Sequence, residues 1–77
     1  MPTLTANYGY DIHQLELSDA EARLIQDRTN FRKSGEVWSE ADEGMTPAVW
    51  RFDFEANEFW IYCENGASFA IHSYEIE

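Results

Sequence analysis

The chain has 77 residues, twelve of them aromatic, and its fifteen acidic and five basic side chains give a net charge of −10. The single cysteine excludes an intrachain disulfide. The scarcity of lysine and arginine disfavours direct binding to nucleic acid or to an anionic membrane surface, because both are bound through cationic side chains. The length predicts one domain over residues 1–77 with an aromatic core.

The first predicted strand covers residues 11–17. His13, Leu15 and Leu17 recur along one side of this segment, with the period of a half-buried strand. Residues 7–9 indicate a bend before it, and residues 4–6 are compatible with a short extension of the strand region.

A helix is predicted over residues 19–33. Ser18 and Glu21 have the spacing of a capping box, in which each side chain binds the backbone N–H of the other residue. Acidic residues lie at its start and basic residues toward its end, as the helix dipole favours. Gly35 is the expected stop, and the apolar stripe of the helix is predicted to cover one face of a sheet.

Residues 36–47 are predicted to connect this helix to the next strand. Trp38 is expected to anchor the connection to the core. Asp42-Glu43-Gly44 is typical of a turn, and Pro47 is expected at the entry to the following strand.

Residues 48–77 predict a three-stranded antiparallel meander. Segments 50–55, 59–63 and 67–72 are rich in aromatic residues, and Asn65-Gly66 predicts a two-residue hairpin turn between the last two. The predicted fold class is therefore α+β, with one α-helix packed on a three- to four-stranded antiparallel sheet. The expected chain order is β-α-β-β-β, with the meander at the C-terminal end.

The register of the meander determines which aromatic side chains are expected on each face. A two-residue turn pairs Trp60 with Ile71 and Tyr62 with Phe69, and a connection of two or four residues pairs Phe54 with Phe59. One face is then the core. The other carries a predicted interface patch made of Trp60, Tyr62, Phe69 and Ile71, with Arg51 opposite Tyr62.

Three alternatives account for this patch. The N-terminal residues Leu4, Tyr8 and Tyr10 cover it, two copies bury it in a symmetric homodimer, or a different protein binds it. A single helix can cover only one face of the sheet, so the patch is expected to be available for another chain.

No pattern predicts chemistry. The register separates Cys63 from His72 by about 13 Å, too far for a nucleophilic pair or a zinc pair. His13 is interpreted as a surface or edge histidine, and the acidic turn at residues 42–43 lacks the ligand spacing of a calcium loop. We therefore predict that the protein is not an enzyme and has no catalytic residue, cofactor or metal.

The acidic residues are the second strong feature of the sequence. Residues 52–77 contain six acids and neither lysine nor arginine. We predict that an acidic partner surface is formed by Asp42, Glu43, Asp53, Glu55, Glu58 and Glu64. This surface has two interpretations. Its charge serves only to keep the protein soluble, or its carboxylates imitate nucleic-acid phosphates and occupy a basic groove on another protein.

In size, acidity and sheet-plus-helix build the chain resembles small phage-encoded inhibitors, among them DNA-mimic anti-restriction, anti-CRISPR and uracil-glycosylase-inhibitor proteins. The resemblance implies an inhibitor in the host cytoplasm that blocks the basic nucleic-acid-binding surface of an enzyme. The alternative is a structural or regulatory subunit that assembles through the aromatic sheet face, without nucleic-acid mimicry. Either way the expected partner is a protein, for the inhibitor a basic one, and the absence of targeting and transmembrane patterns predicts a cytoplasmic location.

Overall fold

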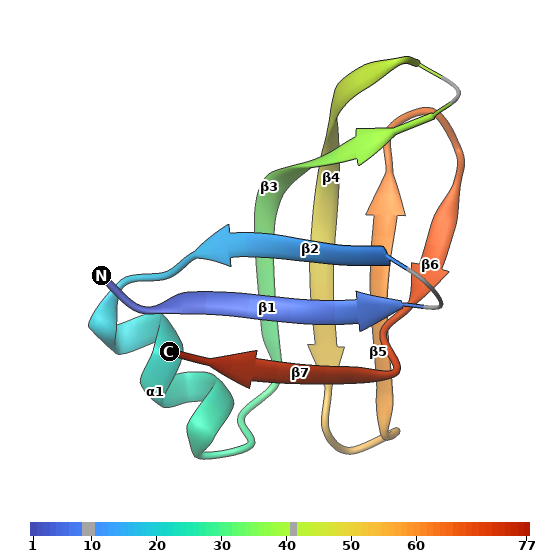
Figure 1. Cartoon of the computed structure of the whole chain (residues 1–77). Coiled ribbons are helices and arrows are strands. Elements are labelled where there is room, and N and C mark those ends of the chain that lie inside the picture. Colours follow the sequence, from blue (N-terminus) through green and yellow to red (C-terminus); the bar gives the residue numbers. More distant parts are fainter. Residues whose placement is uncertain (9–10, 41) are drawn as a thin grey trace.

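The computed structural model describes residues 1–8, 11–40 and 42–77. Within these residues the chain forms two antiparallel sheets and one short helix (Figure 1). The three-stranded sheet has the order β2-β1-β7 and the four-stranded sheet the order β3-β4-β5-β6. The elements in chain order are β1 (Thr3–Tyr8), β2 (Asp11–Glu16), α1 (Asp19–Gln26), β3 (Phe31–Ser39), β4 (Gly44–Asp53), β5 (Glu58–Cys63), β6 (Ser68–Ala70) and β7 (Ser73–Ile76).

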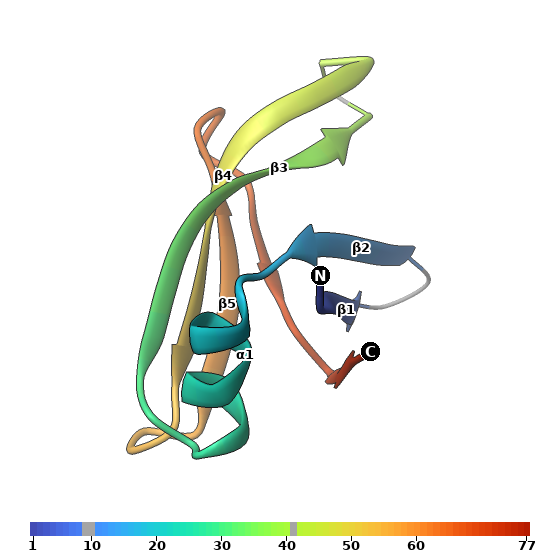
Figure 2. The ribbon, with the colours of Figure 1, turned by 90° about the vertical axis from the view of Figure 1, so that its left-hand side faces the viewer.

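The core lies between the two sheets. The three-stranded sheet crosses one face of the four-stranded sheet, and α1 lies on that same side (Figures 1 and 2). Both sheets and the helix supply apolar side chains to this space, which removes them from water and stabilises the fold. The largest fully buried side chains are those of Leu4, Leu17, Ile25, Val37, Trp50, Phe52 and Ile61.

The predicted fold class is wrong, because a second sheet shares with the helix the task of covering the core face. Its strand β7 was not predicted, and it pairs with β1 so that Leu4 lies opposite Ile76 and Ala6 opposite Tyr74. Such pairing between distant short segments has no local signature in the sequence. The order β-α-β-β-β is replaced by two strands, one helix and five further strands within the described residues.

The start of the helix is confirmed. The Ser18 hydroxyl accepts a hydrogen bond from the backbone N–H of Glu21 at 3.1 Å, and the Ser18 N–H donates to the Glu21 carboxylate at 2.8 Å. Lys33 on β3 donates to the same carboxylate at 2.7 Å and to the Glu16 carbonyl at 3.0 Å. The hydrogen bond from Lys33, followed by that from the Ser18 backbone, lowers the pKa of Glu21. This cluster connects the end of β2 and the start of α1 to β3 of the four-stranded sheet.

The predicted extent of the helix is wrong in its second half. The helix ends at Gln26, Asp27 caps it, and Arg28 adopts a positive φ of 59° that turns the chain away. Residues 31–39 form β3 instead, with Phe31 opposite Phe52 and Gly35 opposite Ala48. Cross-strand pairing with β4 therefore overrides the local helix signals of residues 27–33.

The meander is confirmed, but both of its predicted registers are wrong. Phe59 lies opposite Phe52 rather than Phe54, and Trp60 rather than Tyr62 lies opposite Arg51. This displacement is of two residues and leaves the faces unchanged, because the side-chain period of a strand is two. Pro47 lies inside β4, opposite Glu36, and not at its entry.

The turn between β5 and β6 has the larger consequence. The N–H of Cys63 donates to the Ala67 carbonyl at 2.8 Å and the N–H of Gly66 to the Cys63 carbonyl at 3.0 Å, with Gly66 at a φ of 94°. The loop is thus one residue longer than the predicted two-residue turn, and Phe69 pairs with Ile61. A slip of one residue exchanges the faces of β6, so Phe69 turns toward the core.

Candidate protein-binding surface

The candidate site is the outer face of the four-stranded sheet, which we define as the side away from α1 and the three-stranded sheet. Figure 2 shows this side without any other described element against it. Burial alternates along β4, so every second residue of β4 and of its neighbours points outward. The apolar residues of the outer face are Trp38, Met45, Pro47, Val49, Trp60 and Tyr62.

Three of these side chains are unusually exposed for their size. Trp38 is 51% exposed, Met45 59% and Tyr62 40%. Trp38 and Met45 lie opposite each other on the part of the β3–β4 hairpin that projects beyond β5 (Figure 1). The prediction that Trp38 anchors a loop to the core is wrong, because its neighbours Val37 and Ser39 take the buried positions of β3.

Trp60 and Tyr62 form the centre of the outer face. They are two residues apart on β5, and their rings stack with centroids 6.2 Å apart and an interplanar angle of 19°. β5 can place aromatics outward because Ile61 and Cys63 already supply its buried side. The two stacked rings form one continuous aromatic surface on the outer face.

A shallow depression of about 620 Å³ lies beside Tyr62. Its floor is the backbone of the row formed by Gly35, Ala48 and Cys63, since Gly35 has no side chain and those of Ala48 and Cys63 are buried on the inner side. Such a hollow suits an apolar side chain of another molecule. The complete lining comprises Ser34, Gly35, Pro47, Ala48, Val49, Tyr62, Cys63 and Glu64.

Two arginines lie next to Tyr62 on the side away from the depression of about 620 Å³. Arg32 and Arg51 lie directly opposite each other on β3 and β4, an arrangement that like charges disfavour. The Asp53 carboxylate lies 3.4 Å from the Arg51 guanidinium and reduces that cost. Both arginines, with Val49 and Tyr62, line a depression of about 320 Å³.

The structure brings together three of the five predicted interface residues. Trp60, Tyr62 and Arg51 lie on the outer face, whereas Phe69 and Ile71 lie on the core side, with Ile71 only 7% exposed. Leu4 is buried between the sheets and does not cover the outer face. The side chains of Tyr8 and Tyr10, the other predicted covering residues, lie outside the described residues.

Sequence reasoning missed Trp38, Met45 and Pro47 as outer-face residues. The available signal was the alternation of Val37 and Ser39 with Trp38, which is typical of a half-buried strand. That signal was concealed because residues up to 33 were assigned to a helix and Gly35 was interpreted as the end of that helix.

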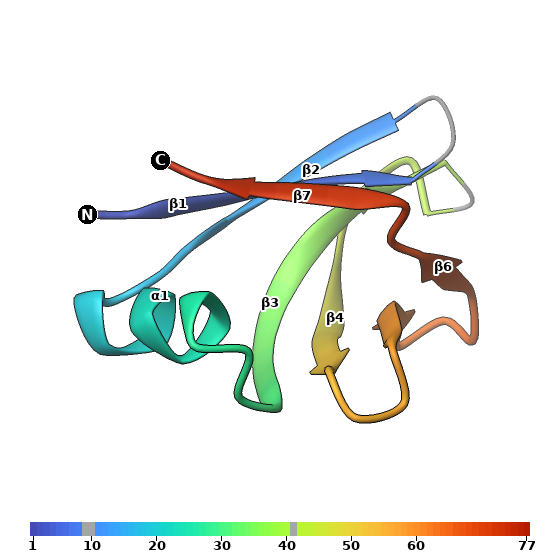
Figure 3. The same ribbon diagram turned by 90° about the horizontal axis from the view of Figure 1, so that it is seen from below.

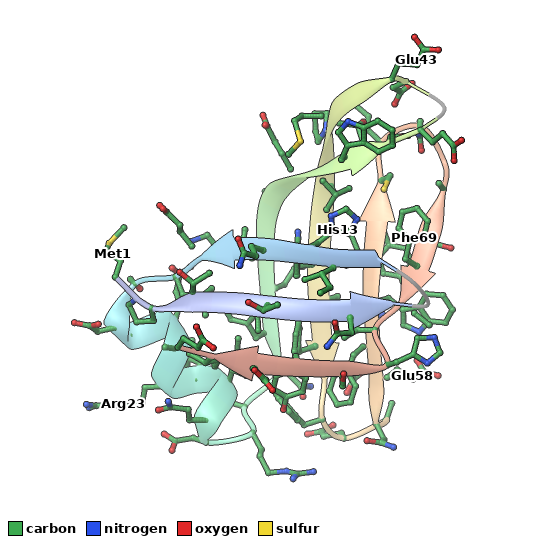
Figure 4. The ribbon with its side chains drawn as sticks, in the orientation of Figure 1. Met1, His13, Arg23, Glu43, Glu58 and Phe69 are labelled. Carbon is green, nitrogen blue, oxygen red and sulfur yellow. The ribbon has the colours of Figure 1, made fainter. Side chains whose placement is uncertain are left out.

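The predicted acidic residues separate into two groups. Asp53, Glu55 and Glu58 surround the β4–β5 turn, whereas Asp42, Glu43 and Glu64 lie at the opposite end of the sheet, as the positions of Glu58 and Glu43 illustrate (Figure 4). No continuous line of charge joins the two groups along one strand. The outer face therefore has an apolar middle and acidic ends, with Arg32 and Arg51 between the middle and the end that carries Asp53 and Glu58.

Hydrogen bonds hold one carboxylate in each acidic group. Asp53 accepts from the N–H of Ala56 at 3.1 Å, and Asp42 accepts from the Asn65 side chain at 3.0 Å. The Asn65 amide also donates to the Ser39 hydroxyl at 3.1 Å. These bonds fix the acidic ends relative to the sheet.

The environment of Cys63 disfavours a nucleophilic role for this residue. Burial raises the pKa of the Cys63 thiol, and the charge of Asp42 raises it further, which disfavours the nucleophilic thiolate. Among residues 1–8, 11–40 and 42–77, no group of three or more candidate ligands could hold a metal ion. In the same residues, no helix has the length and apolar character needed to cross a membrane.

His13 makes the stability of the fold depend on pH. This half-buried side chain lies on the core side of β2, opposite Ala6, with its ring 6.5 Å from that of Phe69. Burial lowers its pKa below the ordinary value of 6.5. As the pH falls below 6.5, the unfolded chain binds a proton that the folded chain binds less readily, so stability is lost.

Thermal unfolding at pH 7.5 and 5.5 checks this expectation. The melting temperature of the wild type should fall more between the two pH values than that of His13→Gln. His72→Gln, which changes an exposed histidine, is the control and should behave like the wild type. Equal falls for wild type and His13→Gln would contradict the prediction.

No protein-family model, curated protein or solved structure matches this chain significantly.

Proposed function

We propose that the protein is a small binding domain that docks the outer face of its four-stranded sheet onto a positively charged surface of another protein. The observation that supports this most is the exposure of Trp38, Met45 and Tyr62 on one side of the sheet, between two acidic ends. A contiguous apolar patch of this kind is typical of an interface.

The composition of the face fits such a role. Tryptophan and tyrosine are the preferred anchors of protein interfaces, surrounded by a polar rim. The molecule measures 34 × 28 × 21 Å, which is large enough for one face to contribute the roughly 800 Å² that each partner supplies to a standard interface. The depression beside Tyr62 would accept an apolar anchor from the partner.

Charge favours a basic partner over a second copy of this chain. Each copy carries a net charge of −10, so two copies repel at long range, whereas a basic surface is attracted and steered into contact. Lysines or arginines at two ends of an apolar partner surface would meet the acidic groups at Asp42 and Glu58.

Inhibition of a nucleic-acid-handling enzyme is the narrower form of this proposal. It is favoured by the acidic tip of the sheet, where Glu40, Asp42, Glu43 and Glu64 have no lysine or arginine beside them in the sequence. Carboxylates at this end would occupy phosphate sites of the enzyme. Duplex DNA or RNA should then compete with the protein for its partner, and a lack of competition would contradict this narrower form alone.

Photocrosslinking tests the docking face. A benzophenone amino acid at position 62 should crosslink a partner from cell extract, whereas the same group at position 14 on the three-stranded sheet should not. Binding of the purified partner should weaken by roughly thirtyfold or more in Tyr62→Ser, as expected for an interface hot spot, and should weaken with added salt.

Ile12→Ser provides the matched control, because Ile12 is 62% exposed on the other sheet. This variant should bind as the wild type does. Equal loss of binding in Ile12→Ser and Tyr62→Ser, or self-association as the only binding observed, would refute the proposal.

A further inference from the structure

The free edge of β7 is a second surface at which backbone N–H and carbonyl groups can bind another molecule. β7 is the last strand of the three-stranded sheet and pairs only with β1 among the described residues, and Figure 3 shows its other edge without a neighbouring strand. Thr3 and Glu77 exchange two hydrogen bonds of 2.9 and 3.0 Å. Because alternate residues of an antiparallel strand face the same neighbour, Tyr74 and Ile76 direct their backbone N–H and carbonyl groups toward the free edge.

The core is incompletely covered beside this edge. Phe54, Phe59, Tyr74 and Ile76 pack against the core but remain partly exposed. The Tyr74 ring lies 5.0 Å from that of Phe52 and 5.9 Å from that of Phe59. An additional strand along β7 would remove more of this apolar cluster from water.

A depression lies where that strand would place its side chains. It has a volume of about 350 Å³ and separates β7 from the C-terminal end of α1. Its residues are Ile25, Gln26, Arg28, Tyr74, Glu75 and Ile76. Ile25, Tyr74 and Ile76 give this depression an apolar part beside the polar Gln26, Arg28 and Glu75, so apolar side chains and free backbone groups occur together at one edge.

We propose that the β7 edge accepts an extended segment of another protein as a fourth strand of the three-stranded sheet. The segment alternates apolar and basic residues. Its apolar side chains lie on the side of Tyr74 and Ile76 and enter the depression, while its basic side chains lie on the opposite side, next to Glu75 and Glu77. Backbone pairing supplies affinity and the alternation supplies specificity.

A second copy of this chain fits the edge poorly. Symmetric antiparallel pairing that uses the free groups of both Tyr74 and Ile76 places Glu75 directly opposite Glu75 of the other copy. Like charges in that position are destabilising, and the net charge of −10 on each copy adds to the repulsion. Basic residues of a different protein remove both costs.

Peptide titration followed by NMR tests this inference. The probe is the capped hexapeptide Val-Lys-Val-Lys-Val-Lys, and the control is Val-Val-Val-Lys-Lys-Lys, which has the same composition without alternation. The alternating peptide should bind about tenfold more tightly, because only its alternation places every valine on the side of Tyr74 and Ile76 and every lysine beside Glu75 and Glu77 when its backbone pairs with β7. Its binding should slow hydrogen exchange at the amides of Tyr74 and Ile76.

Two changes separate edge pairing from charge attraction. Ile76→Pro removes the N–H that faces the free edge without removing a bond to β1, and should abolish the preference for the alternating peptide. Methylation of alternate peptide nitrogens should do the same with the wild-type protein, which keeps the test valid if the proline variant unfolds. Equal binding of all peptides, or pairing of two protein copies through β7, would overturn the inference.

Tyr62→Ser distinguishes this edge from the docking face proposed above. It should leave binding of the alternating peptide unchanged. Loss of peptide binding in Tyr62→Ser would show that the peptide binds the outer face and would overturn the assignment to β7.

Discussion

Replacement of Phe52 by alanine is expected to lower the free energy of unfolding by about 3–5 kcal/mol, the range for removal of a large buried aromatic side chain. Phe52 is 1% exposed. Its ring contacts those of Phe31, Phe54, Phe59 and Tyr74, with centroid separations of 5.0 to 6.2 Å. Because Tyr74 belongs to β7, the substitution removes a contact that joins the two sheets.

Urea unfolding measures this loss. Small domains have total stabilities of about 5–15 kcal/mol. If the wild-type stability lies near the lower end of that range, much of the Phe52→Ala population should be unfolded without urea. Met45→Ala is the control, since Met45 is 59% exposed on the outer face and should change the free energy by about 0.5 kcal/mol or less. Similar losses in the two variants would contradict the assigned core.

Replacement of Gly35 by alanine is expected to cost about 1–3 kcal/mol, as overpacking of a core usually does. A Cβ atom at this position would lie 2.5 Å from Leu15 Cδ1 and 3.4 Å from Trp50 Nε1. Leu15 is 8% exposed and Trp50 is fully buried, so neither side chain can move aside without repacking. Gly35 therefore sets how closely β2 approaches β3.

Gly44→Ala is the matched control for Gly35→Ala, because its nearest new contact would be the Asp42 carbonyl at 3.9 Å. It should change the melting temperature little. Combining Gly35→Ala with Leu15→Ala should cost less than the two separate changes added together, since the smaller side chain relieves the overlap. Strict additivity would argue against the close contact of the two residues.

The parts of the fold that could be predicted from the sequence depend on neighbouring residues. The capping box of Ser18 and Glu21 and the strand that contains Leu15 are examples, since a few adjacent side chains decide them. The meander was also predictable, because its turns lie between strongly apolar runs. The inward and outward faces of β4 followed from the same alternation.

The parts that could not be predicted depend on distant pairing or on single-residue detail. The helix signals of residues 27–33 are overridden by the pairing of Phe31 with Phe52. No local sequence pattern reveals that pairing. Gly66 is compatible with hairpin loops of two lengths, and the longer one moves Phe69 from the predicted interface to the core side. Of the residues in the candidate binding surface, Trp60 and Tyr62 were predicted from the sequence. Trp38 and Met45 were recognised only from the fold.

The central position of β1 in its sheet has a consequence for folding during synthesis. One neighbour, β2, follows it closely, but the other, β7, follows every other element of the domain. While a ribosome extends the chain, one edge of β1 stays unpaired and the inner face of its hairpin, with Leu4, stays open until residues 73–76 emerge. Such distant pairing slows folding, so we expect the nascent chain to be open to proteases and to aggregation until β7 is made.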